Sequence, residues 1–235
     1  MKVLIIIPAY NEESCIIETV KKVYGYNADN GTDYDVIVIN DGSDDNTGKV
    51  LKDNNIPNIG LIQNLGIGGA VQTGYKYAHI NGYDVAVQFD GDGQHDISCV
   101  KDLVKEIENG SDMVIGSRFI DGAKSGFKSS AARRTGIKII SALIKIFTGK
   151  KVYDTTSGFR ACNKRLIEFF AGYYPTEYPE PVSEVTALRR KFVISEVPAN
   201  MYERQGGKSS IHAWKSVYYM INVTFSIILE SLKRC

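Results

Sequence analysis

The chain has 235 residues, of which 43% are hydrophobic and 23% charged, and its formal net charge is +1. This length suits one large domain or two small ones, and the composition excludes wholesale disorder. The near-neutral charge gives no indication of a nucleic-acid partner. Four scattered cysteines without a CxxC pair give no sign of a zinc knuckle or a redox pair, and they fit a reducing cytoplasm.

The first half predicts strands that alternate with helices. Residues 3–7 form an apolar run that Pro8 interrupts, so a buried strand is favoured over a signal peptide. Asn11 is predicted to cap a helix whose first turn carries Glu12 and Glu13. Further strands are expected at 34–40, 58–62, 84–89 and 112–118, and helices within 64–80 and 97–108. Nearly every strand residue is apolar, which is typical of a parallel sheet covered by helices on both faces.

The second half changes character near residue 119. Residues 119–134 are polar, basic and glycine-containing, which predicts a surface loop and then a helix from Ser129 or Ser130 to Phe147. One more strand is expected within 191–205. The tail from 211 to 235 predicts an amphipathic helix that packs on the domain, forms a homodimer or lies on a membrane surface. No apolar stretch reaches the 18 or so residues needed to cross a bilayer.

Polar residues follow three of the predicted strands. Tyr10 and Glu12 follow the first strand, Asp41 follows the second, and Asp90 follows the strand at 84–89. Ligands bind outside the carboxyl ends of the strands in an open α/β sheet. Each cluster alone reads as an ordinary turn or helix cap. Three clusters at the same edge of one sheet favour a ligand site.

The segment DGDGQH at 90–95 places two carboxylates one residue apart, with a glycine between them. A solvated acidic turn is the alternative interpretation. Because the segment follows a strand suited to the sheet interior, where unpaired carboxylates are costly, a divalent cation is favoured. Hard oxygen ligands suit Mg²⁺ or Mn²⁺. Gln94 adds a carbonyl oxygen, and His95 adds a nitrogen that manganese accepts.

Together, the segments PAYNEES, INDGSDDNT, NLGIGGA and DGDGQH resemble the inverting family 2 glycosyltransferases with a GT-A fold. Within that family they resemble the polyprenyl-phosphate branch, which is similar to dolichyl-phosphate mannosyltransferases. The resemblance is strong from Val3 to Arg118 and continues through DTTSGFRA (154–161) and ERQGGKSS (203–210). It implies a Rossmann-like, mostly parallel sheet flanked by helices in one domain, residues 1–210, with residues 211–235 as a helical extension. Residues 1–118 would be the nucleotide-binding half and residues 119–210 the acceptor-binding half.

The resemblance also implies roles for individual residues. Asp41 would contact the base, uracil or thymine. The nucleotide pocket would be lined by Pro8, Tyr10 and Glu12 together with Asp90, and the metal would be held by Asp90, Asp92 and Gln94. Independently of the resemblance, Arg118, Arg204 and Lys208 are expected to bind phosphates of the donor or the acceptor, because basic side chains form charge-assisted hydrogen bonds to them.

An inverting transfer to a hydroxyl group needs a base, and Asp92 and Glu180 are the carboxylates assigned to catalysis. Glu180 is favoured over Glu177 and Glu184 because it precedes Pro181 at a predicted helix start. No base is strictly required when the acceptor is itself a phosphate. Asp154 is interpreted either as a helix cap or as a residue that supports the site.

The predicted activity is metal-dependent transfer of a sugar from a UDP-linked donor. The acceptor would be a polyprenyl phosphate or a lipid-linked or cell-surface glycan. The chain would be cytoplasmic or peripheral at the inner face of the cell membrane. Two alternatives remain open: a nucleotidyltransferase that makes sugar nucleotides, and a non-catalytic sugar-nucleotide-binding module. PAYNEES lacks the basic residue that a nucleotidyltransferase needs for a triphosphate.

Overall fold

The computed structural model describes residues 1–91, 93–123, 131–202 and 213–233. The strands are β1 (Val3–Ala9), β2 (Tyr34–Asn40), β3 (Asn58–Gly60), β4 (Val85–Gln88), β5 (Met113–Ser117), β6 (Arg160–Asn163) and β7 (Ile194–Pro198). The α-helices are α1 (Ile16–Asn30), α2 (Thr47–Asp53), α3 (Gly66–Ile80), α4 (Val100–Glu108), α5 (Ala131–Thr148), α6 (Lys164–Gly172), α7 (Pro179–Arg189) and α8 (Ala213–Leu232), and a 3-10 turn, η1 (Ile97–Cys99), precedes α4.

The described strands form one sheet in the order β3-β2-β1-β4-β6-β5-β7. All neighbouring pairs are parallel except those of β6, which runs antiparallel to both β4 and β5. In register, Ala9 at the end of β1 lies beside Asn40 at the end of β2. Gln88 at the end of β4 lies beside Ile6 of β1. The carboxyl ends of β1, β2 and β4 therefore meet at one edge, as the sequence predicts.

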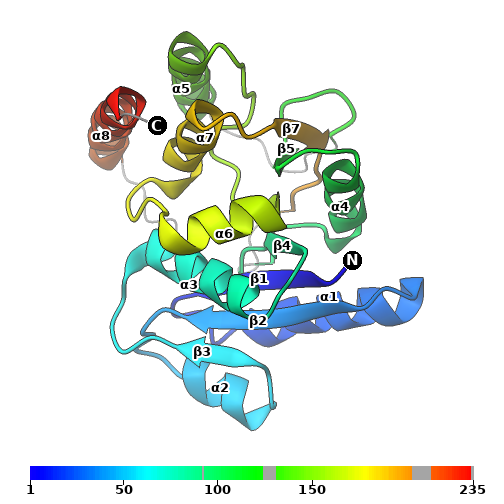
Figure 1. The fold of residues 1–235 in the computed structure, drawn as a ribbon. Coiled ribbons are helices and arrows are strands. Elements are labelled where there is room, and N and C mark those ends of the chain that lie inside the picture. The colour runs from blue at the N-terminus through cyan, green and yellow to red at the C-terminus, as the bar shows by residue number, and fades with distance from the viewer. Residues whose placement is uncertain (92, 124–130, 203–212, 234–235) are drawn as a thin grey trace.

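Helices cover both faces of the sheet (Figure 1). Alternate residues of β1 separate the two cores, because side chains of a strand point to opposite faces. Leu4 and Ile6 pack with apolar residues of α3, α5, α6, α7 and α8. Ile5 and Ile7 pack with apolar residues of α1, α2 and α4. This two-sided burial confirms that helices cover both faces of the sheet, as the apolar strands predict; the sheet is mostly parallel, with β6 as the antiparallel strand.

The start of the first helix differs from the prediction. Helix α1 begins at Ile16, after an N-cap at Cys15, and not at Asn11. Asn11 has a positive φ of 56°, and its side-chain oxygen accepts hydrogen bonds from the backbone N–H groups of Asp44 and Asp45. Asn11 thus ties the turn after β1 to the turn after β2. A short polar side chain that tolerates the left-handed region suits this role better than a cap.

Strand β6 and helix α6 are absent from the sequence prediction. β6 has only four residues, Arg160–Asn163, and lies between β4 and β5. Its first residue, Arg160, is fully buried. A charged residue in a four-residue strand hides the apolar pattern by which buried strands are usually recognised.

Helices α5, α7 and α8 pack together beyond the β5–β7 end of the sheet (Figure 1). Gly136 of α5 lets α8 come close, because a Cβ atom there would lie 3.1 Å from the sulfur of Met220. At the base of α8, Glu230 accepts hydrogen bonds from Tyr173 and Lys233. No helix within the described residues is long and apolar enough to span a bilayer.

Candidate functional site

A pocket of about 440 Å³ lies at the carboxyl ends of β1, β2 and β4. Its walls come from the turns after these strands, the start of α3, the loop before β6 and the start of α7. The described residues that line it are Pro8, Ala9, Tyr10, Glu12, Asp41, Asn64, Gly66, Ile67, Ala70, Asp90, Gly91, Thr156, Gly158 and Glu180. The three polar clusters predicted to converge thus share one pocket. We call it the strand-end pocket.

Asp41 joins the end of β2 to the start of α3. Its Oδ1 atom accepts a hydrogen bond from the backbone N–H of Leu65 at 2.8 Å. Burial raises the pKa of Asp41, although backbone N–H groups of Leu65 and Gly66 oppose the shift. A carboxylate at this position also complements the positive end of the helix dipole. Asp41 therefore anchors α3 while lining the pocket.

The glycine run at the start of α3 serves close packing. A Cβ atom at Gly68 would lie 2.3 Å from the carbonyl oxygen of Pro175, so only glycine fits there. This contact brings the segment before α7 against the start of α3. Glycine at this position therefore permits the close approach of two segments beside the strand-end pocket.

Asp90 lies on the pocket wall, and its side chain is 33% exposed. Its Oδ2 atom lies 2.9 Å from Nε2 of His95, a ring that is buried and stacked on Phe159. Burial by itself raises the pKa of Asp90. The contacts with His95 and Gln88 and the charge of Arg160 outweigh burial and hold the pKa below its usual value. Asp90 is therefore ionised near neutral pH.

Gly158 makes room for the Asp90 carboxylate. A Cβ atom at residue 158 would lie 2.9 Å from Oδ2 of Asp90 and 3.0 Å from Nε2 of Gln88. Any larger residue at 158 would push against the carboxylate on the wall of the pocket. The loop before β6 thus leaves the Asp90 carboxylate accessible on the pocket wall.

Glu180 lies in the first turn of α7 and also lines the pocket. Burial raises the pKa of Glu180, the nearby Asp90 carboxylate adds to the shift, and Arg160 opposes it. Helix α7 begins at Pro179, after Tyr178 in the left-handed region. The sequence therefore locates both the helix start and the acidic residue on it.

Arg160 is buried outside the lining of the strand-end pocket and connects two of its walls. Its guanidinium donates to the carbonyl oxygen of Ser157 at 2.6 Å and to that of Glu180 at 3.3 Å. It also donates to the hydroxyl of Ser183 at 2.9 Å. Ser157 precedes the glycine beside Asp90, and Glu180 lines the facing wall. Arg160 thus holds the loop beside Asp90 to the first turn of α7.

The counter-charge of Arg160 is Glu184, at 3.3 Å, and both side chains are fully buried. Burial lowers the pKa of Arg160, but Glu184, Tyr174, Glu180 and Tyr75 together outweigh burial, so the pKa is raised and the guanidinium stays charged. Oε2 of Glu184 has no hydrogen-bond partner among the described residues. A buried ion pair of this kind contributes little net stability, yet removal of one partner is costly.

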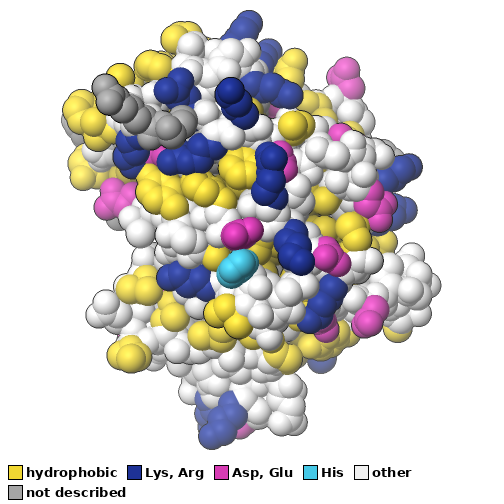
Figure 2. All heavy atoms as spheres, viewed as in Figure 1, with side chains coloured by type: hydrophobic (Ala, Val, Ile, Leu, Met, Phe, Trp, Pro, Cys, Tyr) yellow, Lys and Arg dark blue, Asp and Glu magenta, His cyan; other side chains and the backbone are white. Residues whose placement is uncertain are grey.

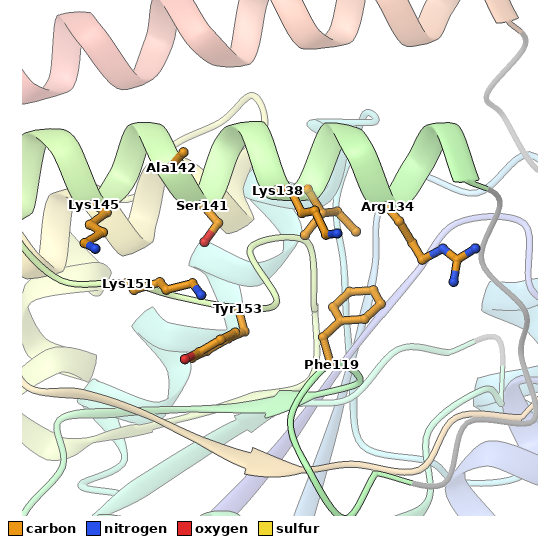
Figure 3. Close-up of a pocket in the computed structure, with 9 residues that line it drawn as sticks. Phe119, Arg134, Lys138, Ser141, Ala142, Lys145, Lys151 and Tyr153 are labelled. Carbon is orange, nitrogen blue, oxygen red and sulfur yellow. The ribbon is translucent and has the colours of Figure 1, made fainter.

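A second pocket, of about 610 Å³, lies between α5 and the segments that follow β5 and α5. Arg134, Lys138, Ser141, Ala142 and Lys145 of α5 face Phe119, Lys151 and Tyr153 across it (Figure 3). Ile137 is buried at its base. Nζ of Lys151 lies 4.1 Å from the centre of the Tyr153 ring. We call this the α5 pocket; it combines cationic groups with aromatic and aliphatic walls.

The segment 153–156 separates the two pockets, since Tyr153 lines the α5 pocket and Thr156 lines the strand-end pocket. The guanidinium of Arg118 fixes this segment through two hydrogen bonds to Asp154, at 2.7 and 2.6 Å, and one to Thr156 at 2.9 Å. On the other side, Glu196 of β7 accepts from the backbone N–H groups of Tyr153 and Asp154.

Several predicted site residues lie elsewhere than on the pocket wall. Arg118 is directed to Asp154 and Thr156, and Asp154 pairs with Arg118 instead of capping a helix. The amide nitrogen of Gln94 donates to the carbonyl of Tyr202 at 3.3 Å, and Gln94 does not line the strand-end pocket. Asp92, Arg204 and Lys208 lie outside the described residues.

Sequence reasoning missed Thr156, Gly158 and Arg160, although it quoted the segment DTTSGFRA that contains them. The available signal was that this segment belongs to the same set of family motifs as the acidic clusters, but no strand was assigned at 160–163. The expected division at residue 118 also cuts across the strand-end pocket, because Thr156, Gly158 and Glu180 complete its walls.

The residues present fit a divalent cation in part. Asp90 supplies an ionised, partly exposed oxygen ligand, and Gly158 leaves room beside it. Asp90 is a hard ligand of the kind that Mg²⁺ and Mn²⁺ prefer. Among the described residues, no group of three or more His, Cys, Asp or Glu side chains is arranged to hold a metal by itself. Such an ion would need further ligands, from Asp92 or from a bound diphosphate.

Comparisons with known proteins give a consistent result. Residues 4–170 match the family model for glycosyl transferase family 2. The UDP-N-acetylglucosamine–dolichyl-phosphate N-acetylglucosaminyltransferase of Methanococcus voltae is 31% identical over 97% of this chain and 98% of its own length. The undecaprenyl-phosphate mannosyltransferase of Micrococcus luteus is 31% identical over 95% of this chain and 93% of its own.

The fold is similar to that of glucosyl-3-phosphoglycerate synthase from Mycobacterium tuberculosis, solved with Mn²⁺ and UDP-glucose. That comparison has a TM-score of 0.69 and 17% identity, and it covers 100% of this chain and 80% of the other. The matched residues, 4–170, include the turns after β1, β2 and β4 and the loop that carries Gly158. The chain is therefore a glycosyltransferase that belongs to glycosyl transferase family 2.

Proposed function

We propose that this glycosyltransferase moves a sugar, with inversion, from a UDP-linked donor to a polyprenyl phosphate, and that a divalent cation is required. The observation that carries the proposal is the opposite charge of two adjoining pockets. The strand-end pocket is acidic and suits a nucleotide diphosphate bound with a cation. The α5 pocket is basic and partly apolar, which suits a phosphate on a hydrocarbon chain.

On the donor side, Pro8, Tyr10 and Glu12 would line the nucleotide, and Asp41 would contact the base. Asp90 would hold the cation together with Asp92 and Gln94. When bound, a divalent cation supplies positive charge to the departing diphosphate. Asp90 is supported for this role by its depressed pKa and by the His95 ring that fixes its carboxylate.

On the acceptor side, Arg134, Lys138 and Lys145 would attract the phosphate of the acceptor to the α5 pocket. Arg204 and Lys208 are proposed to add charge at the phosphates. An oxygen of the acceptor phosphate would then attack the anomeric carbon as the bond from that carbon to the nucleotide diphosphate breaks. Because a phosphate is already anionic at neutral pH, no proton must be removed from it. Glu180 would then line the sugar, and as a base it would matter only for a hydroxyl acceptor.

Arg118 is proposed to act through its neighbours. It fixes Thr156 on the donor side and, through Asp154, the segment that begins with Tyr153 on the acceptor side. Two relatives named for transfer to dolichyl phosphate and undecaprenyl phosphate support an isoprenoid phosphate over a glycan acceptor.

The experiment combines the purified chain with Mn²⁺, farnesyl phosphate and, in separate reactions, UDP-N-acetylglucosamine, UDP-glucose or GDP-mannose. We expect one UDP-sugar to yield a farnesyl phosphate monosaccharide and free UDP, detected by mass spectrometry. Release of pyrophosphate would indicate nucleotidyl transfer instead. Tight donor binding with neither transfer nor hydrolysis would indicate a non-catalytic binding module. Either result would overturn the proposal.

A further inference from the structure

The outward face of α8 carries a row of apolar side chains that no other described residue covers. Tyr218, Ile221, Phe225, Leu229 and Leu232 are each more than half exposed. Successive helix residues lie about 100° apart, so these five positions fall on one side of the helix. Their spacing of three or four residues continues through most of α8. The row is therefore a continuous stripe; we call it the α8 stripe.

The other side of α8 is apolar as well. Val223 and Ile227 are fully buried in the core beneath it. A helix at a water-facing surface normally carries polar residues on its outer side. Exposed apolar patches of this kind mark contacts with proteins or membranes. The second apolar side of α8 thus has no partner among the described residues.

The neighbouring helix supplies positive charge. Arg134, Lys138 and Lys145 of α5 are exposed along one side, and Ile139 and Ile146 are exposed about 100° further round the helix. Helix α5 contains no Asp or Glu. The only acidic residue of α8 is Glu230, which is 4% exposed and paired with Lys233.

The views agree with this arrangement. Helix α8 packs on α5, and Figure 3 shows α8 on the side of α5 away from the pocket. In Figure 2, Lys and Arg side chains gather in the upper part of the molecule, near hydrophobic side chains at the upper left, where Figure 1 places α8. Around the α5–α8 pair, the α8 stripe is therefore followed by the exposed isoleucines of α5 and then by the cationic side chains of α5.

We propose that the α5–α8 pair docks on the surface of an anionic lipid bilayer. The α8 stripe would enter the boundary between head groups and acyl chains, and Arg134, Lys138 and Lys145 would lie at the level of the lipid phosphates. This inference deepens the proposed function and rests on it for the location of the acceptor. Docking in this orientation brings the α5 pocket to the layer in which a polyprenyl phosphate carries its phosphate.

Charge favours a membrane over a second copy of the chain. A two-fold contact through the α8 stripes would bring the basic helices of two copies toward each other, and like charges brought together at an interface are unfavourable. An anionic bilayer attracts the same residues. No described helix can span the bilayer, so contact through this face would be peripheral.

The test is flotation with vesicles made of phosphatidylglycerol and phosphatidylcholine at 0.1 M salt. We expect the parent chain to float with these vesicles and to bind pure phosphatidylcholine vesicles at least about tenfold more weakly. Phe225→Glu should reduce binding to the mixed vesicles by about tenfold, because it places a charge in the stripe. Ile80→Glu, a matched change at an 80% exposed residue at the end of α3, should float like the parent.

Both variants should keep the thermal stability of the parent and the transfer rate to farnesyl phosphate in solution, because neither residue lines a pocket. A parent that does not float overturns the docking proposal, as does a parent that binds both vesicle types equally. A stable dimer in solution that Phe225→Glu splits, without vesicle binding, would assign the stripe to a second copy. A chain that floats but transfers no sugar would leave docking standing and overturn the proposed function.

Discussion

The strand-end pocket and the α5 pocket differ in charge. The acidic residues Glu12, Asp41, Asp90 and Glu180 line the first, and no Lys or Arg does among the described residues. Arg134, Lys138, Lys145 and Lys151 line the second, where no described carboxylate is found. Four residues of chain, Tyr153 to Thr156, lead from one pocket to the other. Two phosphate-bearing ligands can therefore bind in different ways, one through a cation in the acidic pocket and the other directly to the basic side chains.

This difference has a physical consequence. An acidic pocket repels a nucleotide diphosphate unless a cation lies between them, so binding there should depend on a divalent ion. A basic pocket attracts a phosphate directly and needs no ion. The apolar walls around Phe119 and Tyr153 favour a phosphate that carries a hydrocarbon chain. Each of the following changes acts on one side of this comparison.

The largest effect is expected from Asp90→Asn. The change keeps the shape of the side chain but removes the ionised oxygen that would hold the cation. We expect transfer and Mn²⁺-dependent UDP binding to fall at least about a hundredfold. Asp53→Asn, at an exposed residue ending α2, is the control and should leave both unchanged. Unchanged UDP affinity in Asp90→Asn would place the cation elsewhere.

Arg160 provides the next test, because it links the loop beside Asp90 to α7. Arg160→Met should lower the free energy of unfolding by about 3 to 5 kcal/mol, since it leaves Glu184 buried without a counter-charge. The double variant with Glu184→Met should recover at least about 2 kcal/mol of this loss, measured by urea denaturation.

The double variant then separates stability from positioning. Its transfer rate should stay roughly tenfold or more below that of the parent while its affinity for UDP changes little, because the hydrogen bond to the Glu180 carbonyl is lost. If transfer recovers together with stability, Arg160 has only a structural role.

On the basic side, Lys138→Glu combined with Lys145→Glu should raise the KM for farnesyl phosphate about tenfold, by replacing attraction with repulsion. The KM for the UDP-sugar should stay within about twofold. Lys101→Glu with Lys105→Glu, at exposed positions of α4, is the matched control. An equal rise in the KM for the UDP-sugar and in the KM for farnesyl phosphate would show that donor and acceptor do not bind in separate pockets.

The smallest effect is expected from Glu180→Gln with a phosphate acceptor, a loss of less than about tenfold, because no base is needed. For a hydroxyl acceptor a general base contributes roughly 10² to 10⁴-fold. Burial raises the pKa of Glu180, so a base at this position would make the rate rise with pH through a range above that of an ordinary glutamate. A large loss, together with removal of that rise, would contradict a phosphate acceptor.

The first half of the fold was predictable because its signals are local. Apolar strands such as Val3–Ala9 end in polar turns, and parallel strands bring those turns to one edge, so Tyr10, Asp41 and Asp90 were found from sequence. Helix starts depend on finer contacts. The side chain of Asn11 accepts a hydrogen bond from the backbone of Asp44 in the turn after β2. Nothing in the sequence around Asn11 distinguishes a residue with this role from a helix cap.

The remaining features depend on contacts between distant segments. Arg160 is a fully buried cation whose partner, Glu184, lies 24 residues away, so the local sequence does not show that its charge is paired. Because Arg160 belongs to a strand of only four residues, the apolar pattern of a buried strand is also missing there. Arg118 was predicted to grip phosphate, but Asp154, 36 residues away, takes its guanidinium. The α5 pocket is formed by Phe119, one side of α5, Lys151 and Tyr153. The helical spacing of the α5 residues could not show which segments lie opposite that side of the helix.

One calorimetric experiment tests the opposite charges of the two pockets most directly. UDP and farnesyl phosphate are each titrated into the parent chain, first with Mn²⁺ and then with EDTA in its place. We predict that UDP affinity falls at least about a hundredfold in EDTA, whereas farnesyl phosphate affinity changes by less than about twofold. Equal UDP affinity in both solutions would contradict the account, because the acidic pocket would then bind a diphosphate without a cation.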